Sequence, residues 1–339
     1  MTAGRRRLLT AASTVAGVAL FVFVVRRAGA ADILNGIQRV GWGLIVVLLI
    51  AGVRFVLRSQ SWRLCMPDGA RLPLGRAFRA FLAGDSVGNV TPLGLVASEP
   101  TKVFLSRHHL ATRDAVASLA AENVVYASSV ATMVSVGLLV VLLTVPLPST
   151  WQWALGAALA AIAAAVIGGR RLLRGTWDER RGLRPRWREE IAAVRQAVAA
   201  FSVGQSGRFQ RAYALDLVYH ATAVLEVYLT LRWVLGDPAS SVSGAGHITL
   251  TQAIAFEALN RVVTVAFKFV PFRVGIDEAL TGAVAPMLAL DPAAGITLAV
   301  VRKVRNLFWT GAGLAIIAAH PAQSASPAEP SGSVPGRQT

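Results

Sequence analysis

Residues 88–102 read GNVTPLGLVASEPTK, and they interrupt long apolar runs that flank them on both sides. Pro92 cannot donate a helical hydrogen bond, and Gly94 allows the chain to turn. Glu99 and Lys102 bring opposite charges three positions apart, a spacing that places them on one helical face. Because a purely apolar helix avoids all of these residues, the stretch predicts a broken helix around a polar site.

The composition of the chain is that of a multi-pass membrane protein. Of 339 residues, 54% are hydrophobic and 15% are charged, against about 25% charged in soluble domains. The mean hydropathy is +0.54, and several apolar runs reach the roughly 20 residues that cross a bilayer. We therefore expect an all-α, polytopic fold with two re-entrant or broken-helix hairpins and about six full spans, at 8–25, 41–57, 115–145, 151–169, 212–235 and 294–319.

The N-terminus has features of a signal peptide. Arg5–Arg7 precede the apolar run 8–25, and Ala28–Ala30 has the small residues of a cleavage site. The apolar run is long for a signal peptide, however, and Arg26 and Arg27 separate it from the cleavage site. We expect a retained first span, with the N-terminus in the cytoplasm.

The basic charge of the chain is better explained by membrane topology than by nucleic-acid binding. The net charge is +16, and cytoplasmic loops of membrane proteins are rich in Arg and Lys. Residues 170–211 hold eleven Arg against four acids, which predicts a cytoplasmic linker. Within it, residues 187–201 have helical periodicity, typical of either a helix on an anionic membrane surface or a solvated linker. The tail 321–339 is rich in Pro, Ser and Ala, and we expect it to be disordered.

The sequence favours neither a metal nor a cofactor. Cys65 is the single cysteine, which excludes a disulfide within the chain and a cysteine-based metal centre. The five histidines lack the spacing of a metal site. We expect no cofactor.

An internal repeat relates two parts of the chain. PLGLVASE at 92–99 and PFRVGIDE at 271–278 both run from a proline to a glutamate seven residues later. The offset of 179 residues also pairs the apolar segments that flank the two motifs. We therefore expect one membrane domain, residues 1–320, with repeat halves at about 41–145 and 212–320 and interrupted hairpins at about 76–98 and 250–280.

Loop charges predict that the two halves have opposite orientations. Arg-rich segments at the N-terminus, at 58–80 and at 170–211 belong inside, so the first hairpin opens to the cytoplasm and the second opens outward. The basic residues of 302–305 fit this arrangement only if they line a polar cavity. In the alternative, 250–270 is a full span and these residues face the cytoplasm.

Charged residues at membrane depth usually face a cavity, a partner or a transport pathway. We expect the two motifs to form one headgroup site, with phosphate on Lys102, Arg273 or Arg302 and with amines or hydroxyls on Glu99 and Glu278. The alternative is that these charges only pair with one another and fix helix packing. The same choice applies to five further charged residues: Glu122, Glu226, Glu257, Arg261 and Lys268. We interpret Asp216 with His220 as a local pair, and we expect four tryptophans to be interfacial anchors: Trp151, Trp153, Trp233 and Trp309. The candidate substrate-binding residues are Asn89, Pro92, Gly94, Glu99, Lys102, Pro271, Arg273, Gly275, Asp277, Glu278 and Arg302.

Two stretches of the chain resemble motifs of a known family. NVTPLGLVASEPTKVFLSRHHLATRDAVASLAAENVVYASS and PFRVGIDEALTGAVAPMLALDPAAGITLAVVRKVRNLFW resemble the two motifs of the lysylphosphatidylglycerol synthase transmembrane-region family, also called flippase-like membrane proteins. The sequence departs from the family pattern at three places: ASE replaces GGE at 97–99, Asn123 replaces a basic residue, and Arg273 replaces a small residue. The resemblance implies a bacterial inner-membrane protein that moves or presents polar lipids with anionic or amine-bearing headgroups.

Three functions remain open at this point. The first is a lipid transporter, whose energy must come from an ion gradient, a partner or the lipid gradient, because no nucleotide-binding motif is present. The second is a membrane enzyme, which we do not expect because we find no metal or nucleophile motif and no synthase domain after the last span. The third is an accessory subunit for a partner lipid-modifying enzyme or glycosyltransferase. The lipid cargo and the oligomeric state stay undetermined.

Overall fold

The computed structural model describes residues 38–91, 94–174, 192, 194–201, 206–236, 248–266, 272 and 276–319. The expected first span at 8–25, most of the Arg-rich linker and the expected disordered tail lie outside these residues. Within them every regular element is a helix and there is no strand, which confirms the expected all-α fold.

Two series of helices follow each other along the chain. The first consists of α3 (Gly43–Leu64), α4 (Leu74–Val90), α5 (Gly94–Ser106), α6 (Thr112–Thr144) and α7 (Ser149–Arg174). The second consists of α9 (Ser206–Leu235), α10 (Leu250–Ala266), α11 (Ile276–Val284), the 3₁₀ turn η4 (Pro286–Leu288) and α12 (Pro292–Ala318). Each series thus contains a long helix, a short helical hairpin and a second long helix.

Four of the described helices are long and apolar enough to cross a bilayer: α3, α6, α7 and α9. They coincide with four of the expected spans. Helix α12 is also 27 residues long, but three basic residues lie in its middle. Its assignment as a full span stays a prediction.

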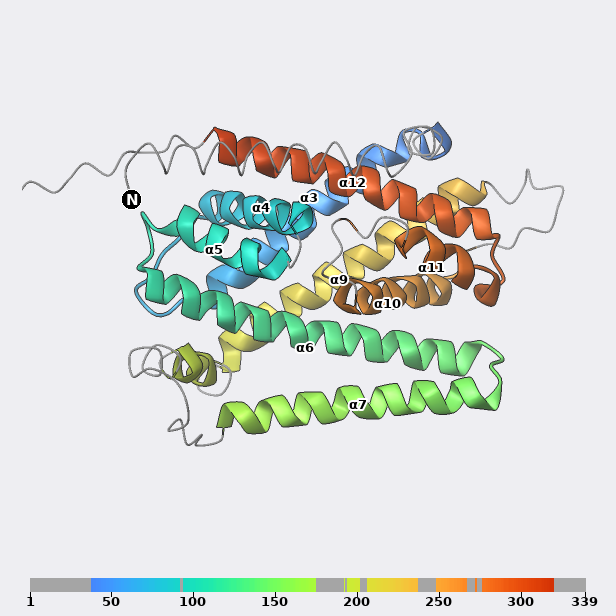
Figure 1. Cartoon of the computed structure of the whole chain (residues 1–339), viewed down its shortest axis with the longest axis horizontal. Helices are drawn as coiled ribbons and strands as arrows, with labels where there is room; N and C mark the ends of the chain where they lie inside the picture. Colours follow the sequence, from blue (N-terminus) through green and yellow to red (C-terminus); the bar gives the residue numbers. More distant parts are fainter. Residues whose placement is uncertain are drawn as a thin grey trace, which may run out of the picture.

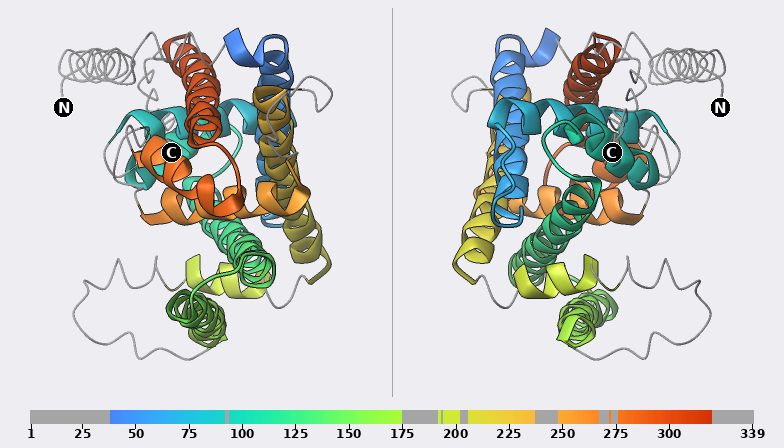
Figure 2. Two further views of the ribbon diagram at one scale, coloured as in Figure 1. Left: turned by 90° about the vertical axis from the view of Figure 1, so that its right-hand side faces the viewer. Right: turned by 90° about the vertical axis from the view of Figure 1, so that its left-hand side faces the viewer.

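The two hairpins lie at opposite ends of the molecule (Figure 1). Helices α4 and α5 occupy the end where α6 begins, whereas α10 and α11 occupy the end where α12 begins. Figure 2, which views the molecule from its two ends, shows the long helices around the hairpins. The packing is reciprocal, because α4 packs against α12, α10 packs against α6, and α3 packs against α9. The inverted relation of the two halves itself stays a prediction.

Proline and aspartate residues explain several helix boundaries. Helix α4 ends at Val90, and Thr91 is extended (φ −107°, ψ 141°) because the ring of the following proline disfavours helical backbone. Helix α12 begins with Pro292, and the Asp291 side chain accepts a hydrogen bond from the Ala293 amide at 2.7 Å. Both features are typical of helix starts.

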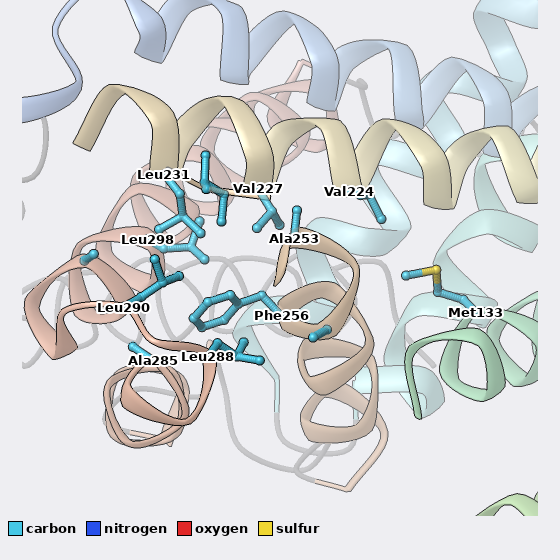
Figure 3. Packing of buried hydrophobic residues seen from close by; sticks show 13 residues of the cluster. Met133, Val224, Val227, Leu231, Ala253, Phe256, Ala285, Leu288, Leu290 and Leu298 are labelled. Atoms are coloured by element: carbon cyan, nitrogen blue, oxygen red, sulfur yellow. The ribbon is translucent and has the colours of Figure 1, made fainter. Parts of the chain in front are cut away.

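Each hairpin approaches a long helix at a glycine. A Cβ atom on Gly137 of α6 would collide with the Cβ of Ala258 on α10, and one on Gly313 of α12 would collide with Ser86 on α4. Small residues allow helices in membranes to pack closely. The hydrophobic core at the α10 end includes Phe256 and lies between α9, α10, η4 and α12 (Figure 3).

One expected loop is in part helical. The sequence assigned Arg58 to a cytoplasmic loop, but α3 continues to Leu64 and Arg58 is only 7% exposed. The prediction failed because it took a charged residue as the end of an apolar span. In the structure, carboxylates on other helices compensate this charge and the helix continues.

Candidate functional site

A cavity of about 300 Å³ lies among α3, α4, α5, α6, α9, α10 and α12. Its size is at the lower end of the range for small-molecule sites. Among the described residues, its wall has two acids, Asp85 and Glu99, and five basic side chains: Arg54, Arg58, Lys102, Arg261 and Arg305.

The close packing of α4 against α5 brings the opening motif to this cavity. A Cβ atom on Gly94 would lie 2.5 Å from the carbonyl oxygen of Gly88, so this crossing requires glycine. Further along α5, the Lys102 ammonium lies 2.9 Å from the Glu99 carboxylate. It also lies 4.1 Å from the ring centre of Phe81, within cation–π range.

Arg58 of α3 binds two buried acids. Its guanidinium lies 2.6 Å from Glu122 of α6 and 3.7 Å from Asp216 of α9. Its plane also lies over the ring of Tyr126, 3.6 Å from the ring centre. These contacts connect three helices at one side of the cavity.

Glu257 of α10 holds two arginines. It lies 2.6 Å from Arg261 on the same helix and 2.7 Å from Arg302 on α12. Arg261 also donates hydrogen bonds to the hydroxyls of Tyr126 at 3.2 Å and Tyr219 at 3.4 Å. Arg261 is thereby directed toward the cavity, whereas Arg302 supports it from behind.

Glu226 of α9 forms a third cluster with Arg54 and Arg305. The Arg54 guanidinium lies 3.1 Å from this carboxylate, and Arg305 forms a short ion pair with its other oxygen. Within the described part of the chain, the Nε atoms of Arg54 and Arg261 have no hydrogen-bond acceptor. Both Nε atoms are themselves buried, so neither is exposed to the cavity.

The charges are arranged in two layers. Glu122, Asp216, Glu226 and Glu257 are at most 1% exposed and do not line the cavity. Of the arginines that they bind, four line it and Arg302 does not: the four are Arg54, Arg58, Arg261 and Arg305. Buried charges are tolerated only when they are paired, and here the acids pair from the protein side. The cavity surface is therefore predominantly basic and suits an anion.

The structure brings together one part of the predicted site. Asn89, Gly94, Glu99 and Lys102 line the cavity, and Asn89 donates hydrogen bonds to Asp85 at 3.1 Å and Thr310 at 3.3 Å. Pro92, Pro271, Arg273 and Gly275 lie outside the described residues.

The described charges of the second motif lie elsewhere. Glu278 forms an ion pair with Lys303, and Asp277 is on the same helix; neither lines the cavity, and Arg302 lies behind Arg261. Among the described residues, the charges of the first motif line the cavity and those of the second motif do not.

Sequence reasoning missed most of the arginines and tyrosines of the wall. Arg54 and Arg58 are four residues apart at the end of an apolar span, and this repeated charge at membrane depth was an available signal. Asp216 and His220 do not form the expected local pair, because Asp216 lies beside Arg58 and His220 contacts Ser129 at 3.1 Å. Trp309 lines the cavity and donates a hydrogen bond to the Leu48 carbonyl at 3.2 Å, and its expected role as an interfacial anchor stays a prediction.

The described residues contain no group of three or more His, Cys, Asp or Glu side chains that could hold a metal ion. The site is therefore defined by paired charges, amides and aromatic rings around a polar cavity.

Comparisons with known proteins identify the family of this chain. A search of curated proteins found no match, and a search of solved structures found none. The family model described as "Lysylphosphatidylglycerol synthase TM region" matches residues 9–313, which include every described helix except the last residues of α12. The chain is a membrane protein that belongs to the lysylphosphatidylglycerol synthase transmembrane-region family.

Proposed function

We propose that this protein binds the phosphate-bearing headgroup of a polar lipid in the central cavity and translocates or presents that lipid across the bacterial cytoplasmic membrane. The observation that carries the proposal is the layered charge of the wall, in which four arginines line the cavity and their carboxylate partners lie behind them. In this proposal the cavity binds and transports the lipid, and no covalent bond is made or broken there.

The residues of the wall match the chemistry of a phosphate headgroup. A guanidinium binds phosphate oxygens through two parallel N–H groups, and the cavity is lined by four arginines: Arg54, Arg58, Arg261 and Arg305. The hydroxyls or amines of a headgroup would find acceptors in Glu99, Asp85 and Asn260, which line the same cavity.

The surroundings support a lipid ligand over a soluble anion. Helices long enough to cross a membrane bound the cavity, and the family is named for a synthase of a phospholipid. Translocation would follow if the two repeat halves moved against each other around this cavity, as inverted-repeat transporters do. In this proposal the N-terminus is cytoplasmic.

The test is lipid translocation in vesicles that contain the purified protein and a fluorescent phosphatidylglycerol. The informative variant is Arg54→Gln, because Glu226 keeps Arg305 as a partner and the fold keeps its buried pair. We expect a loss of about tenfold in rate, which corresponds to one lost charge-assisted contact of about 1.4 kcal/mol. Arg208→Gln removes an ion pair with the exposed Asp68 and is the matched control.

A folded Arg54→Gln variant with the wild-type rate would contradict the headgroup site. An equal loss of rate in Arg208→Gln would also contradict it, because the effect would then not depend on the cavity. A neutral diacyl lipid with the same fluorophore serves as the second control, and we expect no Arg54-dependent transport of it.

One observation favours a second function, that of an accessory subunit. Helix α7 packs against α6 and makes no comparable contact with another described helix, and none of its most apolar window is buried. An accessory role for a lipid-modifying enzyme or glycosyltransferase would use this surface and would tolerate Arg54→Gln. The rate of the partner reaction in cells would then fall with substitutions on α7 alone.

A further inference from the structure

A second hollow adjoins the central cavity. A groove of about 580 Å³ lies between α5 and α6. Apolar side chains form most of its wall, including Val103, Phe104 and Val116. Glu99 and Asn123 line both this groove and the central cavity, so the two hollows share a wall.

The groove opens at the surface of the helix bundle. Phe104 is 52% exposed and Val116 is 39% exposed, on facing helices. Helix α5 packs closely against α4 but touches α6 only sparsely. Arg107, at the end of the groove, lies over the Phe104 ring at 4.0 Å.

We propose that this groove is a lateral portal that holds an acyl chain of the lipid whose headgroup occupies the central cavity. The inference rests on the proposed function and adds the path by which the lipid enters. A membrane lipid has a charged head joined to apolar chains. The structure places a basic polar cavity next to an apolar groove that reaches the surface, and Glu99 and Asn123 line both hollows.

Another apolar groove shows that size alone does not select the portal. The groove between α6, α9 and the start of α10 is larger, about 800 Å³. None of the described residues that line it also lines the central cavity. A chain in that groove would be separated from a headgroup in the cavity, and so the shared lining at Glu99 and Asn123 favours the α5–α6 groove.

In this proposal the groove gives the acyl chain a place beside the bound headgroup and adds little to the binding free energy of the lipid. Hydrocarbon around the protein is as apolar as the groove, so an acyl chain gains little free energy when it moves from one to the other. The headgroup contacts would provide the binding energy, while the groove lets the chain remain apolar with the head inside the bundle. The side chain of Glu99, paired with Lys102 at 2.9 Å, lies at the junction that the headgroup must pass.

Photocrosslinking tests this position directly. The photoreactive variants are Val116→benzoylphenylalanine on α6 and Phe104→benzoylphenylalanine on α5, the latter an exchange of one aromatic residue for another. The matched control is Val136→benzoylphenylalanine, because Val136 is also an exposed valine of α6 but lines the larger groove. The probes are radiolabelled dioleoyl phosphatidylglycerol and dioleoylglycerol, which have the same chains and differ in the phosphate-bearing headgroup.

We expect positions 104 and 116 to label with phosphatidylglycerol several-fold more than with dioleoylglycerol. We also expect that Arg54→Gln removes this preference, because the headgroup then loses its site. Position 136 should label equally with both probes, as contact with bulk lipid predicts. Equal labelling by both probes at 104 and 116 would overturn the portal.

The two proposals can fail separately. Arg54-dependent transport with no headgroup preference at 104 or 116 would refute the portal and leave the transport proposal standing. A headgroup preference without transport would support the portal and the headgroup site, and would refute translocation. Absence of both results would refute both proposals.

Discussion

Arg261 of α10 and Arg302 of α12 bind the two oxygens of one carboxylate, that of Glu257, at 2.6 and 2.7 Å. Glu257 is 1% exposed, so this cluster joins α10 to α12 within the bundle. Arg261 extends from it to the cavity wall and to the hydroxyls of Tyr126 and Tyr219. The cluster thus connects a structural charge network to the candidate binding surface.

Neutralising this carboxylate should destabilise the protein strongly. Glu257→Gln leaves two buried arginines without their shared acid, and breaking a buried ion pair in this way costs about 3–5 kcal/mol. The free energy of unfolding in detergent, measured by denaturant titration, checks this expectation. Glu99→Gln is the comparison, because the Glu99 side chain is 25% exposed and binds one cation, Lys102, so its loss should cost less than that of Glu257.

Equal destabilisation by the two substitutions would show that the buried cluster is no more important than the pair at the cavity wall. That result would contradict the two-layer arrangement of charge on which the proposed function rests.

Glycines at the two hairpin contacts should be sensitive to a single methyl group. Gly137→Ala would force α10 away from α6, and Gly313→Ala would force α4 away from α12. Overpacking of this kind costs about 1–3 kcal/mol. Gly156→Ala on α7 is the control, because a Cβ atom there meets no described atom within 4 Å.

The control should not lower the melting temperature, since alanine favours helix by about 1 kcal/mol over glycine. Thermal unfolding of the purified variants measures all three. If Gly137→Ala and Gly313→Ala have the melting temperature of the wild type, the helices do not approach closely at these glycines in the membrane protein.

The sequence predicted the helical fold and one wall of the site, but not the site as a whole. Pro92, Gly94, Glu99 and Lys102 marked the first hairpin because helix breakers and charges are conspicuous in an apolar run. The partner of Arg54 is Glu226, 172 residues away, and no local pattern predicts a pairing between helices so distant in sequence. The position of Glu278 outside the cavity was hidden for the same reason, because its partner Lys303 is on another helix.

The pair at the cavity junction should have opposite effects on anion binding when each partner is neutralised. Lys102→Gln removes a positive charge that lines the cavity, and we expect weaker binding of phosphatidylglycerol and slower transport. Glu99→Gln leaves Lys102 without its carboxylate at 2.9 Å, so the headgroup should bind more tightly and leave more slowly. Binding by native mass spectrometry and transport in vesicles, measured on the same preparations, check both expectations.

For Glu99→Gln we expect a saturation constant below that of the wild type together with a lower maximal rate. Weaker binding in both variants would mean that the ion pair maintains the shape of the cavity and that neither charge acts on the ligand. Glu278→Gln is the comparison, because its carboxylate does not line the cavity and should not lower the saturation constant.

The inverted arrangement predicts that the connections after the two hairpins, α5–α6 and α11–α12, face opposite sides of the membrane. The turn between α5 and α6 contains the exposed His108, and the turn between α11 and α12 contains Met287, which is 48% exposed. Cys65 is buried, so the wild type serves as an unlabelled control for thiol reagents. We expect His108→Cys to react only after the membrane is permeabilised and Met287→Cys to react in intact cells.

This outcome follows from loop charge, because Arg-rich loops stay in the cytoplasm and the two hairpins lie at opposite ends of the helix bundle (Figure 1). The inverted arrangement places Arg302 and Lys303 in the outer half of the last helix. Both are paired with buried or half-buried carboxylates, so the preference of loop Arg and Lys for the cytoplasmic side does not apply to them. Reaction of both cysteines from the same side would refute the inverted repeat, and with it the rocking movement proposed for transport.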